Sequence, residues 1–306
     1  MRIRVLGSAA GGGFPQWNCG CSNCRDVRAG GIRATARTQE SVAVSSDGEG
    51  WVLLNTSPEI RQQIEGFAGL HPRGPRHSPI DAIILTNGDL DHTLGLLSLR
   101  ESHPLVVYAT ERMWLGFTEG NVLYKTLERF PGQITWRRLK LGREEELARG
   151  DGSGTGLLVD AVAVPGKPPI HLEDGRARDA EDNIGLRIRE ASTGRRLAYF
   201  AAAGGVTPAV RDALADADCA FFDGTFWSSD ELPGLGLGQK RAEDMAHLPI
   251  GGADGSLAAL GNLTTRRRIY IHINNTNPIL REDSAERREV EAAGWEIAWD
   301  GLEVTL

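Results

Sequence analysis

Hydrophobic and polar positions along the 306 residues predict short strands first and a mixture of strands and helices after them. Polar and apolar side chains alternate over residues 41–46, an Asp-Gly pair follows at 47–48, and a second apolar run covers residues 51–54. Alternation at period two on both sides of a turn-forming pair is typical of a β-hairpin. A further strand is expected at residues 2–6, before a Gly-rich loop.

Later segments alternate between strand-like and helix-like patterns. We predict strands at residues 80–86, 105–108, 157–164, 184–189, 196–201, 219–222, 268–273 and 295–299. Helices are predicted over residues 57–67, 93–100, 111–130, 207–215, 256–261 and 283–293, with a weak break at Gly116 and Gly120 in the third. Residues 142–156 are expected to form a surface turn, and the Gly-rich residues 228–255 a lid or an insertion beside a site. Because no linker divides the two β-rich halves, we expect one domain over residues 1–306, with two packed sheets between helices.

The formal net charge is −7, and hydrophobic residues make up 41% of the chain, which is ample for a large core. The run of three arginines at 266–268 is too short to form a basic stripe, so nucleic acid is not an expected partner. No apolar stretch reaches the roughly 18–20 residues that cross a bilayer, and residues 1–7 are too short and polar for a secretory signal. We therefore expect a cytoplasmic protein outside the membrane, for which a homodimer is one compatible state.

Three of the four cysteines lie within six residues, in the motif Cys19-Gly-Cys21-Ser-Asn-Cys24. Thiols at this spacing can converge on one tetrahedral ion, and Zn²⁺ bound by thiolates needs such clustering. Because the ligands would be thiolates and no catalytic base is near in sequence, a structural zinc that holds the N-terminal loop is favoured over a catalytic metal. Three reduced cysteines are the alternative. Cys219 lies in an apolar run and is expected to be a buried small hydrophobe.

Polar side chains at the ends of two predicted strands are candidates for a second metal. Asp91 and His92 follow the strand at 80–86 and offer a carboxylate and an imidazole, although Asp91 could instead cap the helix at 93–100. His272 lies near the end of another apolar strand, where it could equally be a buried core histidine. Spacing alone leaves these alternatives open.

Further candidates lie in the loops beside these strands. Asp223 and Thr225 follow the strand at 219–222. His247 borders the Gly-rich insertion, where it could be a ligand, a substrate contact or a helix-end residue. The loop after His272 holds amides that could hydrogen-bond each other, groups around a metal or a polar substrate, namely Asn274, Asn275 and Asn277.

Together these motifs resemble the metallo-β-lactamase superfamily and, within it, the family of pyrroloquinoline quinone (PQQ) biosynthesis protein B. The superfamily loop reads His-x-His-x-Asp-His after a strand. Here residues 86–92 read Thr-Asn-Gly-Asp-Leu-Asp-His, so Asn87 and Asp89 replace two imidazoles. The other matching segments span nearly the whole chain: residues 6–24 with the three cysteines, Asp223–Trp227 (Asp-Gly-Thr-Phe-Trp), His247–Ile250 (His-Leu-Pro-Ile) and His272–Pro278 (His-Ile-Asn-Asn-Thr-Asn-Pro).

The resemblance implies an α/β fold, an αββα sandwich with the metal at one end of the sheets. It also implies a role in making the redox cofactor PQQ from a peptide-derived, cross-linked Glu–Tyr precursor. The family has been described both as assisting transport of PQQ or its precursor and as an iron-dependent hydroxylase acting on the tyrosine ring. A related branch, the phosphodiesterase of the carbon–phosphorus lyase pathway, shares the three-cysteine zinc site; its fourth ligand, a His, corresponds to Asn275 here.

These departures favour a single redox metal over a hydrolytic pair. A dinuclear hydrolase needs both metals, but two imidazoles are replaced and the bridging Asp of the superfamily is absent, with Ala202 as the nearest match. Two His and one carboxylate with open positions form the ligand set of non-heme Fe(II) oxygenases. We therefore expect Asp91, His92 and His272 to bind one Fe(II).

The remaining polar residues would then act on the substrate. Catalytic roles, in orienting the substrate or moving a proton, are expected for Asp89, Asp223, His247, Asn274 and Asn277. Substrate binding is expected for Asn87 and Thr225, with Lys240 and Arg241 as cationic partners for the carboxylates of the precursor. Two other functions remain open, namely a carrier that holds PQQ or its precursor without turnover and a vestigial hydrolase.

Overall fold

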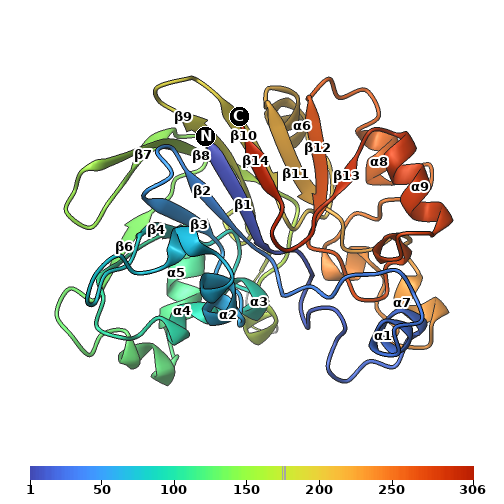
Figure 1. Ribbon diagram of the computed structural model, residues 1–306, viewed down its shortest axis with the longest axis horizontal. Helices are drawn as coiled ribbons and strands as arrows, with labels where there is room; N and C mark the ends of the chain where they lie inside the picture. Colours follow the sequence, from blue (N-terminus) through green and yellow to red (C-terminus); the bar gives the residue numbers. More distant parts are fainter. Residues whose placement is uncertain (174, 176) are drawn as a thin grey trace.

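Two seven-stranded sheets pack face to face, and helices cover the outer face of each (Figure 1). The computed structural model describes residues 1–173, 175 and 177–306. This arrangement is the αββα sandwich expected from the sequence.

The first sheet pairs strands from both ends of the chain. Its spatial order is β14 (Glu303–Thr305), β1 (Arg2–Gly7), β2 (Ser41–Ser45), β3 (Trp51–Leu54), β4 (Ile80–Ile84), β5 (Leu105–Ala109) and β6 (Ile134–Arg138). The predicted hairpin is confirmed, because β2 and β3 are antiparallel with Val42 opposite Leu54. From β3 to β6 the neighbouring strands are parallel, so their carboxyl ends lie at one edge of the sheet.

The second sheet has the order β13 (Glu296–Ile297), β12 (Arg267–Ile271), β11 (Cys219–Asp223), β10 (Arg196–Phe200), β9 (Ile184–Glu190), β8 (Gly154–Ala163) and β7 (Glu145–Ala148). In β8, Leu157 and Val159 are buried while their neighbours are partly exposed, as expected for a half-buried strand. Strands β10 to β13 are parallel. The carboxyl ends of β11 and β12 therefore lie side by side.

Apolar side chains fill the space between the sheets. Ile3, Leu53, Ile83, Leu186 and Phe221 are at most 1% exposed and belong to one cluster drawn from both sheets. A second cluster packs the outer face of the second sheet against its helices. Burial of one such side chain contributes about 1.5–3 kcal/mol to the stability of the folded chain. The core therefore holds in place the strand ends that carry polar residues.

Short helices connect the strands and cover the sheets (Figure 1). The α-helices are α1 (Ser22–Arg28), α2 (Ile60–Glu65), α3 (Leu90–Thr93), α4 (Gly95–Ser98), α5 (Glu111–Thr118), α6 (Pro208–Ala215), α7 (Glu231–Gly234), α8 (Ser256–Ala259) and α9 (Ala285–Ala292). The 3-10 helices are η1 (Ala68–Leu70), η2 (Val122–Thr126), η3 (Ile170–Leu172), η4 (Glu243–Met245) and η5 (Pro278–Leu280). Helix α6 begins where it does for a local reason. The Thr207 hydroxyl accepts from the backbone N–H of Val210, and Pro208 occupies the first turn.

Several elements differ from the predictions. The turn predicted at residues 142–156 contains strand β7, and the hydrophobic pattern does not predict β6 or β14. These three strands form the outer edges of the sheets or are very short, so they lack a continuous apolar run. The break expected at Gly120 is confirmed, because this residue lies between α5 and η2 at φ +70°. The break expected at Gly116 is wrong, since α5 continues through that residue.

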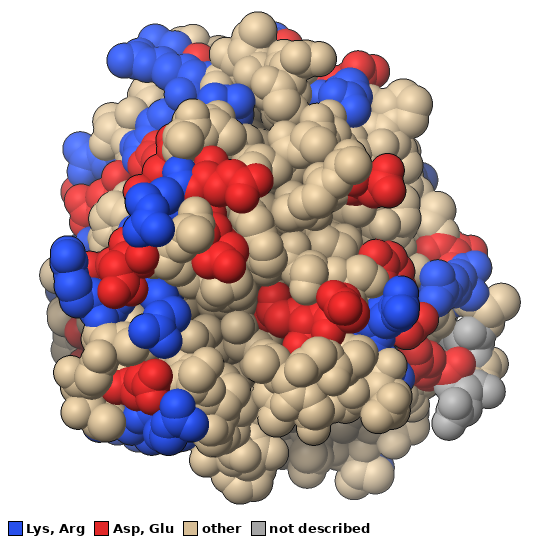
Figure 2. All heavy atoms as spheres, turned by 90° about the vertical axis from the view of Figure 1, so that its right-hand side faces the viewer, with Lys and Arg blue, Asp and Glu red and all other residues tan. Residues whose placement is uncertain are grey.

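Charged side chains of both signs are mixed over the face shown in Figure 2, which has no extended basic patch. Exposed ion pairs such as Arg189–Glu144 contribute about 0–1 kcal/mol each, so stability rests on the core. Among the described residues, none of the helices combines the length and apolar composition needed to span a membrane.

Candidate functional site

The candidate ligands gather where strands of the two sheets end. Asp91 and His92 follow β4, Asp223 ends β11, and His272 comes directly after β12. Packing of the sheets brings Asp91 and His272 into contact although 181 residues separate them in the chain. Strand-end loops on a rigid scaffold are where functional side chains concentrate.

The backbone after β4 decides how the first two candidates point. The helix expected from residue 93 begins earlier, at Leu90, and its N-cap is Asp89. Asp91 and His92 therefore lie inside the first turn of α3, and Asp91 is not the capping residue. The N-terminal loop passes close by because Gly11 has no side chain, since a Cβ there would lie 3.3 Å from Oδ2 of Asp91.

Asp91, His92 and His272 form a compact group of metal-ligating atoms. Oδ2 of Asp91 lies 3.1 Å from Nε2 of His272 and 3.7 Å from Nε2 of His92. One donor atom from each residue lies within 4.8 Å of the other two. Both histidines are buried, while the Asp91 side chain is 16% exposed. Two imidazoles and a carboxylate are suitable ligands for a first-row transition metal, so this donor set fits one cation.

Thr225 determines which nitrogen of His272 faces the site. Its Oγ1 lies 2.6 Å from Oδ1 of Asp223 and 2.8 Å from Nδ1 of His272. Because the hydroxyl donates to the carboxylate, it accepts from the Nδ1–H of His272, and Nε2 is left to face Asp91. His272 also has a left-handed backbone, φ +59°, which is costly for this residue and typical of functional sites. These contacts favour a ligand over a core histidine.

Burial and neighbouring charge give the two imidazoles opposite pKa shifts. Burial lowers the pKa of His92 to about 4, although Asp91 opposes this. Burial also disfavours the charged form of His272, but the hydrogen bond and charge of Asp91 raise its pKa to about 9. Burial disfavours the Asp91 carboxylate in turn, yet the two histidines hold its pKa well below the usual range.

These values predict that metal binding depends on pH through one proton, because a metal binds neutral imidazole. His92 is already neutral above about pH 4, whereas His272 must lose a proton at any pH below about 9. We expect the apparent affinity for Zn²⁺, measured by calorimetry, to rise ~10-fold per pH unit from pH 6 to pH 8. An affinity that stays constant over this range would contradict the pKa of His272.

Asp223, His247 and His272 form a second group of candidate ligands, but the Asp223 carboxylate is saturated. Its oxygens accept hydrogen bonds from the backbone N–H groups of Ala203 and Thr225, the Thr225 hydroxyl and Nδ1 of His247, all at 2.6–2.8 Å. A carboxylate has about four lone-pair sites, and three of these accept from groups that are not candidate ligands, so a second metal would have to replace the hydrogen bond to His247. Asp223 instead orients His247, whose ring stacks on His272 with the centroids 5.4 Å apart.

Asn87 and Asp89 lie beside the candidate ligands. Asn87 is buried, and its Oδ1 accepts from the backbone N–H of Asp89 at 3.0 Å. Burial and the charge of Asp91 raise the pKa of Asp89, while the charge of Lys167 opposes the shift. The Lys167 side chain is only 12% exposed and makes a long ion pair, 3.8 Å, with Glu173. Sequence reasoning missed Lys167 because its Pro-rich loop carries no motif; low exposure of a lysine is a structural signal.

Asn274 and Asn277 support the loop that carries His272. Asn277 is fully buried, and its amide donates to the backbone carbonyls of Gly224 and Thr225. The backbone N–H of Asn274 donates to the carbonyl of Thr225 at 3.0 Å. The placement of Asn277 suits support of this loop better than the substrate contact expected from the sequence.

Lys240 and Arg241 are exposed in the segment between α7 and η4. The backbone N–H of Arg241 donates to Oδ2 of Asp244. Within the described part of the chain, no hydrogen bond or ion pair joins either side chain to the candidate ligands. Their role in substrate binding stays a prediction.

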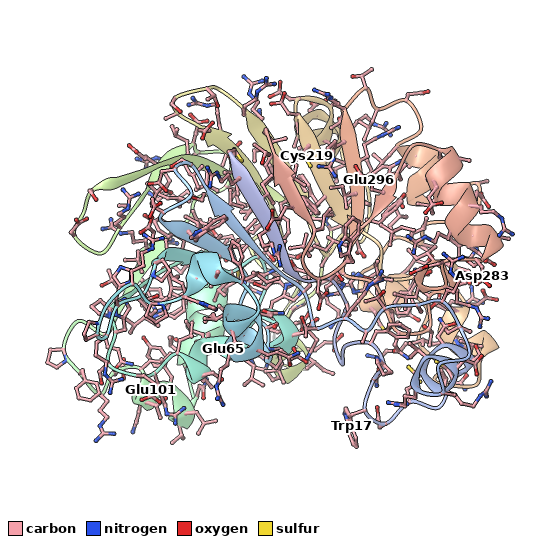
Figure 3. The ribbon with its side chains drawn as sticks, viewed as in Figure 1. Trp17, Glu65, Glu101, Cys219, Asp283 and Glu296 are labelled. Carbon is pink, nitrogen blue, oxygen red and sulfur yellow. The ribbon has the colours of Figure 1, made fainter. Side chains whose placement is uncertain are left out.

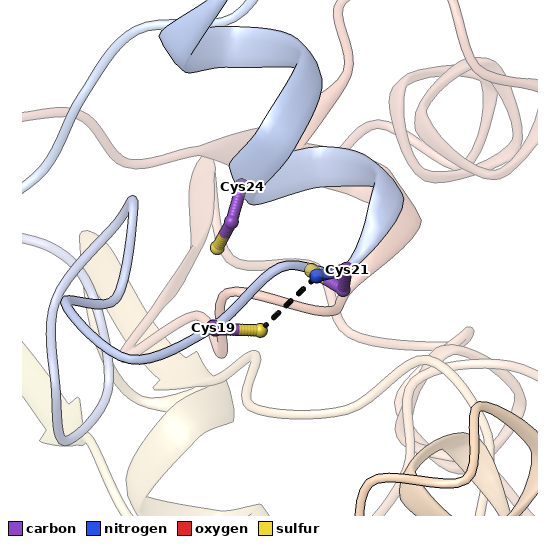
Figure 4. Close-up of side chains that lie close together, drawn as sticks. All are labelled: Cys19, Cys21 and Cys24. Atoms are coloured by element: carbon purple, nitrogen blue, oxygen red, sulfur yellow. Dashed lines mark hydrogen bonds between the residues drawn. The ribbon is translucent and has the colours of Figure 1, made fainter.

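The three clustered cysteines converge on one point (Figure 4). Cys19 and Cys21 precede α1, and Cys24 lies in its first turn and is fully buried. One Sγ atom of each residue lies within 4.8 Å of the other two. The backbone N–H of Cys21 also points to Sγ of Cys19 at 3.4 Å. This set fits a tetrahedral zinc ion with one further vertex.

Asn275 occupies that vertex. Its Nδ2 lies 3.1, 3.7 and 3.3 Å from the sulfurs of Cys19, Cys21 and Cys24. A half-turn of the amide, which scarcely changes its shape, would direct Oδ1, a metal-binding atom, to the same point. The cysteine site is therefore joined directly to the loop that carries His272.

Asn23 makes a second connection between α1 and this loop. Its Nδ2 lies 3.0–3.2 Å from three successive backbone carbonyl oxygens, those of Asn275, Thr276 and Asn277. The Asn23 side chain is buried. The loop after His272 is therefore held on one side by α1 and on the other by the end of β11.

Cys219 lies in the buried core, whereas Trp17 lies at the surface (Figure 3). Cys219 lies at the start of β11, away from Asp223 at the end of the same strand. It is fully buried, and burial raises the pKa of its thiol to about 12, in agreement with the expected small hydrophobe. Trp17, in the loop before the cysteines, is 85% exposed.

Comparisons with known proteins confirm the metallo-β-lactamase fold. Residues 50–273 match the family model of the beta-lactamase superfamily domain. The chain is 46% identical to coenzyme PQQ synthesis protein B of Methylobacterium sp. and 44% identical to the protein of that name from Methylococcus capsulatus, over 100% of each chain. It superimposes on Zn²⁺-bound PqqB from Methylobacterium extorquens with a TM-score of 0.92 and 44% identity, over 100% of both chains. A diphosphatase of the PhnP family, 23% identical over 100% of this chain and 97% of the other, shares the fold with a TM-score of 0.68.

Proposed function

The chain belongs to the family of coenzyme PQQ synthesis protein B, and we propose that it acts in PQQ biosynthesis as a hydroxylase with a single iron ion. The substrate would be the tyrosine ring of a peptide-derived Glu–Tyr precursor. One observation supports the proposal: ligand atoms of Asp91, His92 and His272 lie within 4.8 Å of one another, while the neighbouring carboxylate of Asp223 already accepts four hydrogen bonds. Fe(II) held by these three residues would supply the O₂ chemistry that hydroxylation requires.

The atoms and electrons of the proposed hydroxylation balance as follows. An aromatic C–H becomes C–OH with one oxygen atom of O₂, and the other oxygen atom leaves as water. Two protons and two electrons are consumed, so a small-molecule two-electron reductant must accompany the substrate. Three protein ligands leave coordination positions open, as this reaction requires.

Asp223 and His247 would together move the phenol proton. Nδ1 of His247 donates to Oδ2 of Asp223 at 2.6 Å, so the neutral ring keeps its acceptor lone pair on Nε2. A carboxylate that fixes the tautomer and orientation of an imidazole is the usual support of a general base. The His247 side chain is 14% exposed and stacks on His272, so it lies beside the metal ligands and can be reached by a substrate.

Among the residues that the structure describes, Lys167 is a suitable cation for a substrate carboxylate. It is mostly buried, its ion pair to Glu173 is long, and its charge acts on Asp89 beside the ligands. A hydrogen bond to a charged group contributes about 1.5–3 kcal/mol. We therefore expect Lys167→Met to raise KM for the precursor by ~10- to 100-fold with little change in kcat, in steady-state assays.

The matched control is Lys240→Met, which removes the same charge from an exposed position. If Lys167 binds the carboxylate in place of the Lys240 expected from the sequence, KM is unchanged in this variant. A raised KM for Lys240→Met together with a normal KM for Lys167→Met would reject Lys167 and restore the sequence-based assignment.

The hydroxylase is tested by incubating the iron-loaded protein with the Glu–Tyr precursor and reductant, with and without O₂. Mass spectrometry should show oxygen added to the ring only in the aerobic sample, and ¹⁸O₂ should supply that atom. Tight binding of the precursor or of PQQ with no turnover would instead indicate a carrier. Hydrolysis of a phosphodiester with Zn²⁺ or Mn²⁺ would indicate a retained hydrolase.

A further inference from the structure

A fully buried carboxylate lies behind the metal ligands, at Glu40. Its two oxygens accept from the hydroxyl of Tyr199 and, at 2.9 Å, from Nδ2 of Asn55. Tyr199 belongs to β10 and Asn55 follows β3, so the contact spans the two sheets. Burial raises the pKa of Glu40 to about 7. A buried acid is costly to keep, and the proposed chemistry does not use it.

Asn55 connects Glu40 to Thr86 through hydrogen bonds of its side-chain amide. Because Nδ2 donates to Glu40, Oδ1 must point the opposite way, where it accepts from the backbone N–H of Thr86 at 2.9 Å and from its hydroxyl at 3.0 Å. Asn55 is fully buried and has φ +62°, a conformation that Asn tolerates better than most residues. The surrounding contacts therefore fix both its backbone and its amide.

Thr86 makes the last connection. Its only hydroxyl proton is donated to Asn55, so Oγ1 must act as the acceptor towards Nδ1 of His92, at 3.3 Å. His92 then carries its proton on Nδ1 and presents the Nε2 lone pair towards Asp91. If the Asn55 amide were reversed, the Thr86 hydroxyl would lose this acceptor and could donate to His92 instead.

We propose that Glu40 is a positioning residue for the metal centre, which orients the Asn55 amide and, through Thr86, sets the tautomer and ring orientation of His92. The inference rests on the metal site of the proposed function but not on its oxygen chemistry. It differs from a cross-link between the sheets, because a cross-link would act on stability and leave the histidine tautomer unchanged.

Three variants separate these roles. Glu40→Met removes the 2.9 Å acceptor for Nδ2 of Asn55 and leaves only the weaker contact to the Tyr199 hydroxyl at 3.2 Å. Glu40→Gln keeps an acceptor for Asn55 and a partner for Tyr199, so His92 should keep its proton on Nδ1. Tyr199→Phe removes the hydroxyl that bonds to both Glu40 and Asn55 across the sheets, but it leaves Glu40 bonded to Asn55.

The first readout is the tautomer of His92 in the metal-free chain, from the ring ¹⁵N shifts of its seven histidines, assigned with His92→Ala. The second is Zn²⁺ affinity. We expect Nδ1–H in wild type, Glu40→Gln and Tyr199→Phe. In Glu40→Met we expect a large share of Nε2–H and Zn²⁺ binding roughly 10- to 100-fold weaker, as when a partner behind a ligand is lost.

A folded Glu40→Met variant with the wild-type tautomer and affinity would overturn the inference. The wild-type measurement tests the inference even if that variant does not fold. A proton on Nε2 of His92 in the metal-free wild type would exclude the proposed hydrogen-bond chain from Glu40 through Asn55 and Thr86. Failure of the hydroxylase assay alone leaves both readouts intact, so the two proposals can fail separately.

Discussion

Replacing His272 with alanine is expected to abolish binding of the active-site metal and O₂ consumption together. The imidazole is one of three ligands, and its Nε2 lies 3.1 Å from the Asp91 carboxylate. Loss of a partner behind a ligand already weakens metal binding ~10- to 100-fold, so loss of the ligand itself should exceed ~100-fold. Metal analysis after anaerobic loading, together with an oxygen electrode, measures both effects.

His77→Ala is the matched control, because His77 is an exposed histidine outside the site. It should bind metal and consume O₂ as the wild type does. His272→Ala protein that keeps its active-site metal, or that still turns over the precursor, would show that the ligand set is wrong.

The second large effect is expected for Cys24→Ser. Cys24 is fully buried, and its sulfur is one of three that converge beside Asn275. Structural Zn²⁺ contributes ~10 kcal/mol or more in isolated zinc fingers. A loss of even ~3 kcal/mol would lower the midpoint of thermal unfolding by roughly 6–12 °C, as measured by calorimetry together with the loss of one zinc per chain.

The same variant should also weaken metal binding at the distant ligands. Asn275 connects the cysteines to the loop after His272, and Asn23 holds the carbonyls of that loop. Cys219→Ala, a change in a buried cysteine at the far end of β11, should leave both metal counts intact. Cys24→Ser protein with an unchanged zinc count would refute the structural site.

Short-range features of this chain could be predicted from its sequence. The hairpin of β2 and β3 follows from alternation around an Asp-Gly pair, and it is present. The cysteine cluster follows from spacing over six residues, because neighbouring thiols can converge whatever the rest of the chain does. The hydrophobic pattern also predicts two packed sheets between helices, which are present. It does not predict the edge strands β6 and β7, and the superfamily was identified from the resemblance.

Roles that depend on a partner could not be predicted from spacing. Asp91 was equally suited to cap a helix until the start of α3 at Leu90 placed it inside the first turn. For Asp223 the sequence predicts a role in orienting the substrate or moving a proton, but it does not predict the four donors that its two oxygens accept from. Lys240 and Lys167 are both lysines in loops, and only burial distinguishes them.

The strand-end motifs and the thiol cluster follow from the order of residues alone. The replacement of two imidazoles by Asn87 and Asp89 follows from the resemblance to the superfamily loop. Only the folded chain decided which polar groups face each other across the sandwich, as Glu40 and Tyr199 do over 159 residues. The physical reason is that hydrogen-bond partners, burial and charge depend on distance in space. Local sequence patterns determine these distances within one helix or strand. The packing of the two sheets determines the distances between residues of different elements.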